Sequence, residues 1–111
     1  MKQSLPPPSA EIAAAAFAAL GSEARLAVLQ ALVRAGPDGL AIGDLGARCG
    51  ITGSTLTFHV KILTQAGLVR RTRDGRRILC AADTEALRGL GDYLLAGCCA
   101  DTPSARDIPN G

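Results

Sequence analysis

Cysteine is the residue type in this chain with the clearest capacity for chemistry. Cys80 ends a run rich in arginine, and Cys98 and Cys99 are adjacent near the C-terminal end. Thiolates are soft ligands that select soft, thiophilic ions over hard ones. The one histidine, His59, is far from these cysteines in the sequence, so a zinc site built on imidazoles is not expected.

Basic side chains are concentrated between residues 48 and 77, where seven basic residues accompany one acid. The other residues include five basic and nine acidic side chains, so the overall net charge of +2 conceals a strong segregation. Such a segregated basic stretch is typical of a surface that binds nucleic-acid phosphates. The alternative is that the arginines only keep an exposed strand edge soluble.

A helix that could enter the DNA major groove is predicted between Thr52 and Gly67. Thr52 can cap its start, and Gly67 lies where a helix should end. Three apolar residues recur at helical spacing along one face: Leu56, Val60 and Leu63. The residues expected to face the DNA bases and the nearby backbone are Ser54, Thr55, Thr57, Phe58, His59 and Lys61.

A β-hairpin is predicted directly after this helix. Two extended runs, 69–73 and 76–81, flank Asp74-Gly75, a pair that favours a type I′ turn. A basic hairpin beside a recognition helix suggests a wing that contacts DNA. Its arginines, expected to bind phosphate or the minor groove, are Arg70, Arg71, Arg73, Arg76 and Arg77.

Four more helices are predicted, over residues 10–20, 23–35, 42–49 and about 84–98. Their candidate N-caps are Ser9, Ser22 and either Asp83 or Thr84. The helix over 42–49 is spaced from the next one as in a helix-turn-helix. The residues predicted to face inward are Ile12, Ala16, Phe17, Leu20, Leu26, Leu29, Leu32, Val33, Leu45, Leu87, Leu90, Gly91, Leu94 and Cys98.

Together these elements predict a mainly α fold with a small β-hairpin, a winged helix-turn-helix that forms a dimer. We expect a disordered N-terminal tail over residues 1–8, one DNA-binding and dimerisation domain over 9–99, and a flexible tail over 100–111. The first and last helices are expected to pair across a two-fold axis, because their apolar surface exceeds what one small domain can cover. No apolar run approaches the roughly 20 residues that span a membrane, and no secretory h-region precedes the domain, so we expect a cytoplasmic protein.

The runs LGSEARLAVLQAL (20–32), STLTFHVKILTQAGLV (54–69) and RRTRDGRRILCA (70–81) resemble the ArsR/SmtB group of bacterial winged-helix repressors. The resemblance covers about residues 10–98. It implies a homodimer with the terminal helices at its interface. It also implies a repressor that binds operator DNA when empty and releases it when a metal or metalloid binds.

Two effector sites of this group are missing from the sequence. Ala41 and Gly43 stand where one site has paired cysteines, and the last helix carries Asp92 but no histidine for a zinc site. Cys98-Cys99 is similar to the adjacent cysteines of members that sense trivalent arsenicals. The resemblance therefore favours As(III), methylarsenite or Sb(III) as effector and no zinc. The candidate ligands are Cys80, Cys98 and Cys99, with a cysteine of the other subunit as the rival to Cys80 for the third position.

Other roles remain open for these residues. A thiol-based redox sensor of the same fold would join Cys80 to Cys98 or Cys99, because a disulfide between immediate neighbours is strained. Cys49 is interpreted as a small buried hydrophobe, and the same interpretation stays open for Cys80. His59 either touches a phosphate or bonds within the domain. No nucleophile is paired with a base and no phosphate-binding glycine loop is present, so we do not expect an enzyme.

Overall fold

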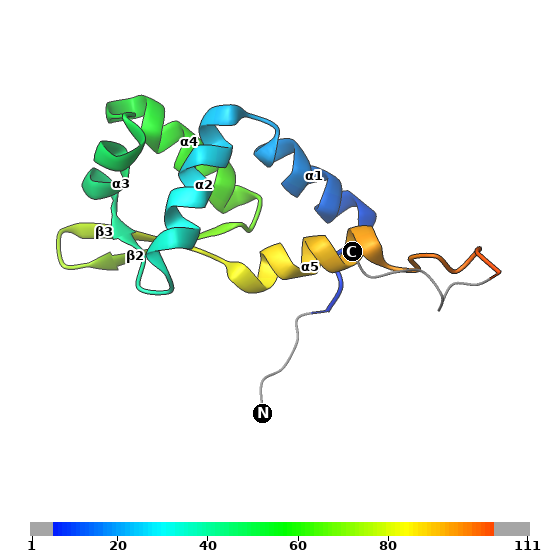
Figure 1. Ribbon diagram of the computed structural model, residues 1–111. Coiled ribbons are helices and arrows are strands. Elements are labelled where there is room, and N and C mark those ends of the chain that lie inside the picture. The colour runs from blue at the N-terminus through cyan, green and yellow to red at the C-terminus, as the bar shows by residue number, and fades with distance from the viewer. Residues whose placement is uncertain (1–5, 104–111) are drawn as a thin grey trace.

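The structure is a computed structural model and describes residues 6–103. Helices and a small sheet form a body, from which α1 and α5 extend toward the same side (Figure 1). This arrangement is the winged helix-turn-helix that the sequence predicts. Most of the two expected tails falls outside the described residues, so the tail boundaries stay predictions.

The first two helices begin at the predicted serine caps. In α1 (Ala10–Leu20), Ser9 Oγ accepts from the Ile12 amide, and in α2 (Glu23–Ala35), Ser22 Oγ accepts from the Arg25 amide. Each serine satisfies a backbone donor that has no partner within its helix. The Arg25 side chain then donates from Nε to the Ala19 carbonyl at 2.6 Å, which joins the end of α1 to the start of α2.

The helix-turn-helix consists of α3 (Ile42–Cys49) and α4 (Gly53–Gln65), both packed against α2. Its turn is tight because Gly50 adopts a left-handed conformation (φ 67°) and the Ile51 amide donates to the Gly46 carbonyl at 3.0 Å. A side chain at Gly46 would place its Cβ 2.5 Å from the Ile51 carbonyl oxygen. Glycine at this position therefore allows the two helices to approach closely.

The sheet contains one strand more than the predicted hairpin. Strand β3 (Arg77–Ala82) lies between β2 (Val69–Asp74) and the short β1 (Leu40–Ala41), and both pairings are antiparallel. Because Asp74 pairs with Arg77, the turn residues are Gly75 and Arg76, so the predicted Asp74-Gly75 type I′ turn is wrong by one residue. Only Gly75 has a positive φ (65°), which fits a turn with glycine at its first central position, as in type II′.

The last helix, α5 (Thr84–Leu95), begins at Asp83, whose side chain accepts from the Ala86 amide. It ends three residues before the predicted end at Cys98. Ala96 leaves the helix with an extended conformation, and Gly97 follows with φ 73°. Successive turns then carry the chain through the two cysteines, with the Cys98 amide bonded to the Leu95 carbonyl and the Ala100 amide to the Gly97 carbonyl.

The hydrophobic core includes residues of α4 and of the sheet. It confirms some of the residues that the sequence predicts to face inward. Leu29, Leu32, Leu45 and Leu90 are buried, as are all three apolar residues of α4. The predicted inward positions that the structure exposes are Ile12, Leu26, Val33, Gly91, Leu94 and Cys98. In their place Ala13, Ala19 and Val28 are buried. The inward faces of α1 and α2 are therefore rotated about the helix axes relative to the predicted ones.

Within the described residues, no single helix is long and apolar enough to cross a membrane. The pair α1–α2 meets the length and composition limits only when taken together across a 99° bend.

Candidate nucleic-acid interface and thiol pair

Helix α4 has one face in the core and one face in solvent. Leu56, Val60 and Leu63 are buried, which fixes how the helix rotates about its own axis. The exposed face presents five of the six residues predicted to meet DNA: Ser54, Thr55, Thr57, Phe58 and Lys61. The helix therefore offers hydroxyl groups, an aromatic ring and one ammonium group to a partner, and it includes no acid.

The hydroxyl of Thr57 is used within the helix, because Oγ1 donates to the Gly53 carbonyl at 3.3 Å. Thr52 stands at the N-cap position, but its side chain makes no cap hydrogen bond. Residue 52 thus occupies the predicted N-cap position, but the predicted cap by its side chain is not formed.

His59 is half-buried beside Phe58, with 5.8 Å between the ring centroids and 57° between the ring planes. Its Nδ1 atom is buried and has no hydrogen-bond partner among the described residues. The interpretation that His59 bonds within the domain therefore gains no support from its Nδ1 atom. An imidazole packed against Phe58 instead supports the aromatic ring from one side.

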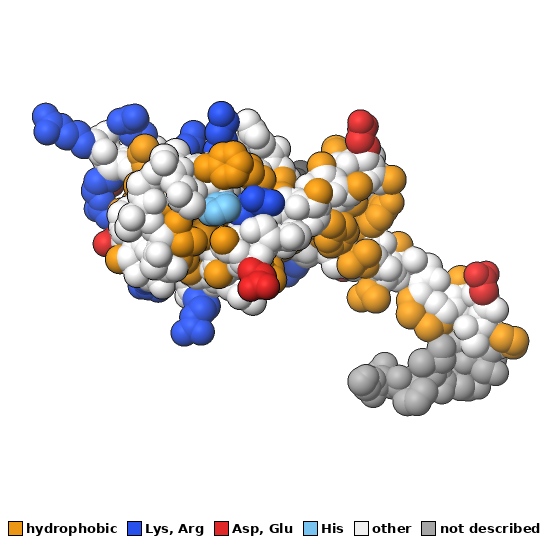
Figure 2. Space-filling model, turned by 90° about the horizontal axis from the view of Figure 1, so that it is seen from above, with side chains coloured by type: hydrophobic (Ala, Val, Ile, Leu, Met, Phe, Trp, Pro, Cys, Tyr) orange, Lys and Arg blue, Asp and Glu red, His pale blue; other side chains and the backbone are white. Residues whose placement is uncertain are grey.

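The wing carries its arginines in solvent. Arg70, Arg71 and Arg73 on β2 are exposed, as are Arg76 in the turn and Arg77 on β3. Across the hairpin, Arg71 faces Cys80 and Arg73 faces Ile78, so the cross-strand neighbours of both are uncharged. Lys and Arg side chains surround the body in Figure 2, whereas the extension to the right shows acidic and apolar side chains on this face. The wing therefore retains the positive charge that phosphate binding needs.

Cys98 and Cys99 lie beyond the end of α5 with their sulfur atoms 2.8 Å apart. Cys98 is exposed, Cys99 is half-buried, and both are free thiols. On a regular helix, neighbouring side chains diverge by about 100°. Cys99 avoids this divergence with a left-handed backbone (φ 67°), which no other non-glycine residue of the described chain adopts. Such a conformation costs free energy and is often found at functional sites.

The hydrogen bond with Cys98, and to a smaller extent burial, raise the pKa of the Cys99 thiol. The Cys99 thiol therefore holds its proton more firmly than an isolated thiol, and a ligand that needs the free thiolate must first displace that proton. Two sulfurs that bind one ion in tetrahedral geometry at about 2.3 Å, the length of a Zn–S bond, lie roughly 3.8 Å apart. The observed separation is 2.8 Å, so the two sulfurs would move apart by about 1 Å to bind one ion.

The structure does not bring Cys80 to this pair within one chain. Cys80 is fully buried in β3, where burial raises the pKa of its thiol and the nearby Arg71 partly opposes that shift. Helix α5 separates it from Cys98, and its 12 residues correspond to about 18 Å. No group of three or more Cys, His, Asp or Glu side chains that could hold one ion occurs in residues 6–103. Cys49 is half-buried, and burial also raises the pKa of its thiol.

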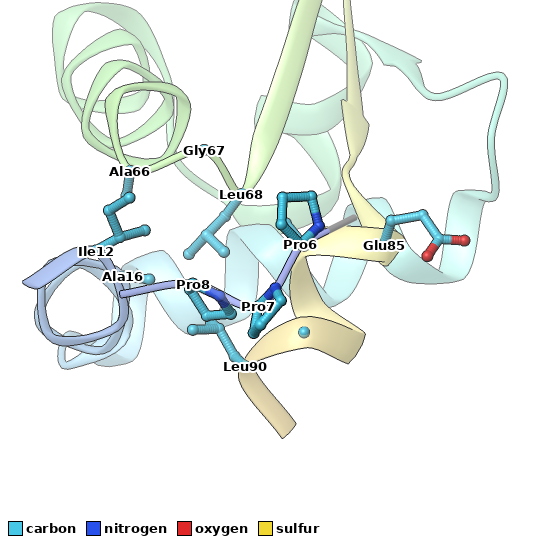
Figure 3. A pocket seen from close by; sticks show the side chains of 12 residues that line it. Pro6, Pro7, Pro8, Ile12, Ala16, Ala66, Gly67, Leu68, Glu85 and Leu90 are labelled. Carbon is cyan, nitrogen blue, oxygen red and sulfur yellow. The ribbon is translucent and has the colours of Figure 1, made fainter. Parts of the chain in front are cut away.

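A pocket that the sequence did not indicate lies where α1, α5 and the α4–β2 junction meet (Figure 3). Its volume is about 310 Å³, and its lining is mostly apolar. In Figure 3 Leu68 points toward the rings of Pro6–Pro8, and the Glu85 carboxylate points away from the other lining residues. Four separate segments line the pocket, so no local sequence pattern could reveal it. The pocket lies at the junction between the body and the two projecting helices.

Comparison with known sequences supports the helix-turn-helix assignment. A model of a helix-turn-helix domain matches residues 20–72. The chain is 38% identical over 66 residues to the uncharacterised HTH-type transcriptional regulator YceK of Bacillus subtilis, covering 60% of this chain and 65% of that protein. It is 33% identical over 88 residues to the nodulation protein NolR of Rhizobium meliloti, covering 77% of this chain and 70% of that protein. The chain thus spans slightly less than two thirds of the first relative.

Solved structures share the fold. The crystal structure of RHA00566, an ArsR family transcriptional regulator, superposes with a TM-score of 0.67 at 23% identity, over 95% of this chain and 100% of that one. The homodimeric winged helix-turn-helix DNA-binding domain of Mb0332 from Mycobacterium bovis superposes with a TM-score of 0.61 at 20% identity, over 91% and 89% of the two chains. At such identities the likeness concerns the fold.

Proposed function

Because the chain belongs to the ArsR family of winged helix-turn-helix transcriptional regulators, we propose that it is a homodimeric repressor released from its operator by a trivalent arsenical. The family consists of regulators rather than enzymes. In this proposal α4 enters the major groove, the wing contacts the flanking backbone or minor groove, and Cys98 and Cys99 bind the arsenical. The repressor would act in the cytoplasm, where its operator lies.

The DNA part of the proposal is supported by the combination of a helix fixed by its buried face and a wing with five arginines and one acid. The core face of α4 fixes which side chains face outward, and all five wing arginines are exposed. Phosphate contacts by arginine supply affinity and register, and contacts from a helix in the major groove supply sequence preference.

The dimer is supported by apolar side chains that one chain leaves uncovered. Ile12 on α1 and Leu94 and Leu95 on α5 are 60%, 65% and 67% exposed, and both helices extend from the body on the same side (Figure 1). A two-fold axis along these helices would bury them and place two copies of α4 on successive half-sites.

The observation that carries the effector assignment is the 2.8 Å separation of two accessible sulfurs held by a left-handed Cys99. Methylarsenite, as CH₃As(OH)₂, offers two hydroxyl groups for exchange. Two As–S bonds form, two As–O bonds break, and each thiol proton leaves with a hydroxide as water, with no change in oxidation state. Because the arsenical supplies the proton acceptor, the raised pKa of Cys99 hinders this reaction less than it hinders zinc, which needs thiolates.

Inorganic As(III) carries a third exchangeable hydroxyl and would take a third thiolate. That ligand would be a cysteine of the partner subunit, or Cys80 after a rearrangement of β3 and α5. The vicinal pair alone is sufficient for methylarsenite.

The start of α5 offers a route from the thiol pair to the DNA. The Asp83 amide donates to the Leu68 carbonyl at 2.9 Å, so α5 begins directly on the α4–β2 junction. The pocket of Figure 3 leaves space for α5 to shift against that junction. An arsenical releases DNA only if it binds the DNA-incompetent arrangement more tightly, and a usual coupling of about 1–3 kcal/mol weakens operator affinity roughly 5- to 150-fold.

An effector titration tests the proposal. A labelled operator, selected by the protein from a random duplex pool, is followed by fluorescence anisotropy while As(III), methylarsenite, Sb(III), Zn(II) or peroxide is added. We expect release by the trivalent arsenicals and not by Zn(II) at the same concentrations. Release by Zn(II) alone would contradict the thiol-pair site, and release by peroxide alone would instead support a redox sensor of the same fold.

A further inference from the structure

We propose that Phe58 reads the C5-methyl groups of thymine, so that each operator half-site must present thymine opposite the middle of α4. The inference rests on the proposed operator binding and specifies which base chemistry α4 recognises.

The position of Phe58 on α4 is the first support. Ser54, Thr57, Phe58 and Lys61 follow the spacing i, i+3, i+4, i+7 and therefore share one face of the helix. All four are exposed, on the side away from the buried stripe. Phe58 lies near the centre of this face and is 56% exposed, although its ring could fill a core position.

The chemistry of the other residues on this face is the second support. The face includes no Arg, Asn or Gln, and Lys61 near its C-terminal end is its only side chain that can read guanine with two hydrogen bonds. The Thr57 hydroxyl is occupied by the Gly53 carbonyl at 3.3 Å, which leaves its methyl group for outward contacts. The centre of the reading face is thus apolar. In the major groove the thymine methyl is the apolar group that distinguishes one base from the others.

The packing of the ring is the third support. The His59 imidazole lies against Phe58 with its centroid 5.8 Å away, and α4 is fixed by three buried residues. A ring held in this way loses little conformational entropy on binding, which favours a specific contact.

A protein partner is the competing occupant for Phe58. The surroundings favour DNA, because Lys61 lies on the same face and the five-arginine wing follows α4 in the chain. The larger set of exposed apolar residues lies elsewhere, on α1 and α5.

Uracil scanning tests the proposal with the intact protein. Each thymine of the selected operator is replaced in turn by uracil, which lacks only the methyl group, and affinity is measured by anisotropy. We expect one or two positions in each half-site to lose affinity about fourfold, the value of one buried methyl-sized group. Phe58→Ala should bind the thymine and uracil duplexes equally at these positions, whereas Phe58→Leu should retain a preference for thymine. Leu26→Ala, which shortens an exposed leucine on α2, serves as the matched control and should retain the full preference.

Two results would overturn the inference while leaving the repressor intact. One is specific operator binding by the wild type with no sensitivity to uracil at any position. The other is a Phe58→Ala variant that is folded by circular dichroism and keeps the wild-type uracil sensitivity, which would assign Phe58 to a protein contact. If the protein selects no sequence from the pool above its non-specific binding, the proposed function itself fails.

Discussion

At the residue scale, zinc and methylarsenite differ in how they remove the proton of the Cys99 thiol. Its pKa is raised, so at neutral pH the thiol is protonated, and any zinc that binds must displace that proton. Below that pKa we expect zinc affinity to rise at least about tenfold per pH unit. Methylarsenite affinity should change little, since its hydroxyl groups remove the thiol protons as water.

Competition titrations at pH 6.5, 7.5 and 8.5 measure this difference. Equal pH dependence of the two ligands would show that the arsenical also requires a preformed thiolate. The hydroxyl-exchange chemistry would then be wrong for this pair.

Individual residues also show where sequence patterns succeed. The caps at Ser9 and Ser22 were predictable because a cap depends largely on local chemistry, and for the last helix the structure selects Asp83 over Thr84. The cap predicted at Thr52 is not formed. The inward face of α1 was not predictable, since nearly every position in AEIAAAAFAAL is apolar and periodicity cannot select a face. Similarly, Asp74-Gly75 and Gly75-Arg76 both suit a two-residue hairpin, and the pairing with the rest of the sheet decides between them.

At the scale of the elements, α3 offers a matched pair of glycines. A Cβ at Gly46 would lie 2.5 Å from the Ile51 carbonyl oxygen and 3.1 Å from Leu56 Cδ2, whereas a Cβ at Gly43 meets nothing within 4 Å. We expect Gly46→Ala to lower the free energy of unfolding by about 1–3 kcal/mol through overpacking. Gly43→Ala should raise it by up to about 1 kcal/mol through helix propensity.

Urea unfolding followed by circular dichroism measures both changes. Equal effects of the two substitutions would contradict the close approach of α3 and α4. The helix-turn-helix spacing was clear in the sequence, but this contact depends on the tertiary position of Ile51 and could not be read from it.

The wing arginines should determine how DNA affinity depends on salt. Replacing Arg73, Arg76 and Arg77 by Ala should weaken binding to all DNA sequences, because phosphate contacts carry little sequence information. The slope of log affinity against log salt should fall by roughly 0.9 for each arginine that touches a phosphate. Thr55→Ala, on α4, should keep the slope and change which operator is preferred. An unchanged salt slope in the triple variant would mean that the wing does not bind the backbone.

At the scale of the whole molecule, the exposed apolar residues of α5 should hold the dimer together. Replacing Leu94 and Leu95 by Asp places charges on side chains that are 65% and 67% exposed in one chain. We expect monomers in analytical ultracentrifugation and loss of high-affinity operator binding, since one α4 would then read only one half-site. Leu26→Asp, on the 42% exposed leucine of α2, is the control and should leave the dimer intact. A stable dimer of the double variant would place the interface elsewhere.

The whole molecule also determines what the cysteines can do. The proposal that Cys98-Cys99 binds a soft ion comes from residue types alone. Their approach to 2.8 Å was not, because it depends on the helix ending at Leu95 and on the left-handed Cys99. The sequence left a buried Cys80 and a ligand Cys80 both open, and the burial depends on β1, which joins the sheet from a distant part of the sequence.

The most direct test of the account is methylarsenite-driven operator release by cysteine variants, measured by anisotropy on one operator. Wild type and Cys49→Ser should both release the DNA, with operator affinity falling roughly 5- to 150-fold. Cys98→Ser, Cys99→Ser and the double variant should bind the operator as tightly as wild type and retain it at the same methylarsenite concentrations. Cys80→Ser should respond to methylarsenite in either case. It should lose its response to inorganic As(III) only if Cys80 is the third ligand. Normal release by the Cys98→Ser, Cys99→Ser double variant would contradict the account.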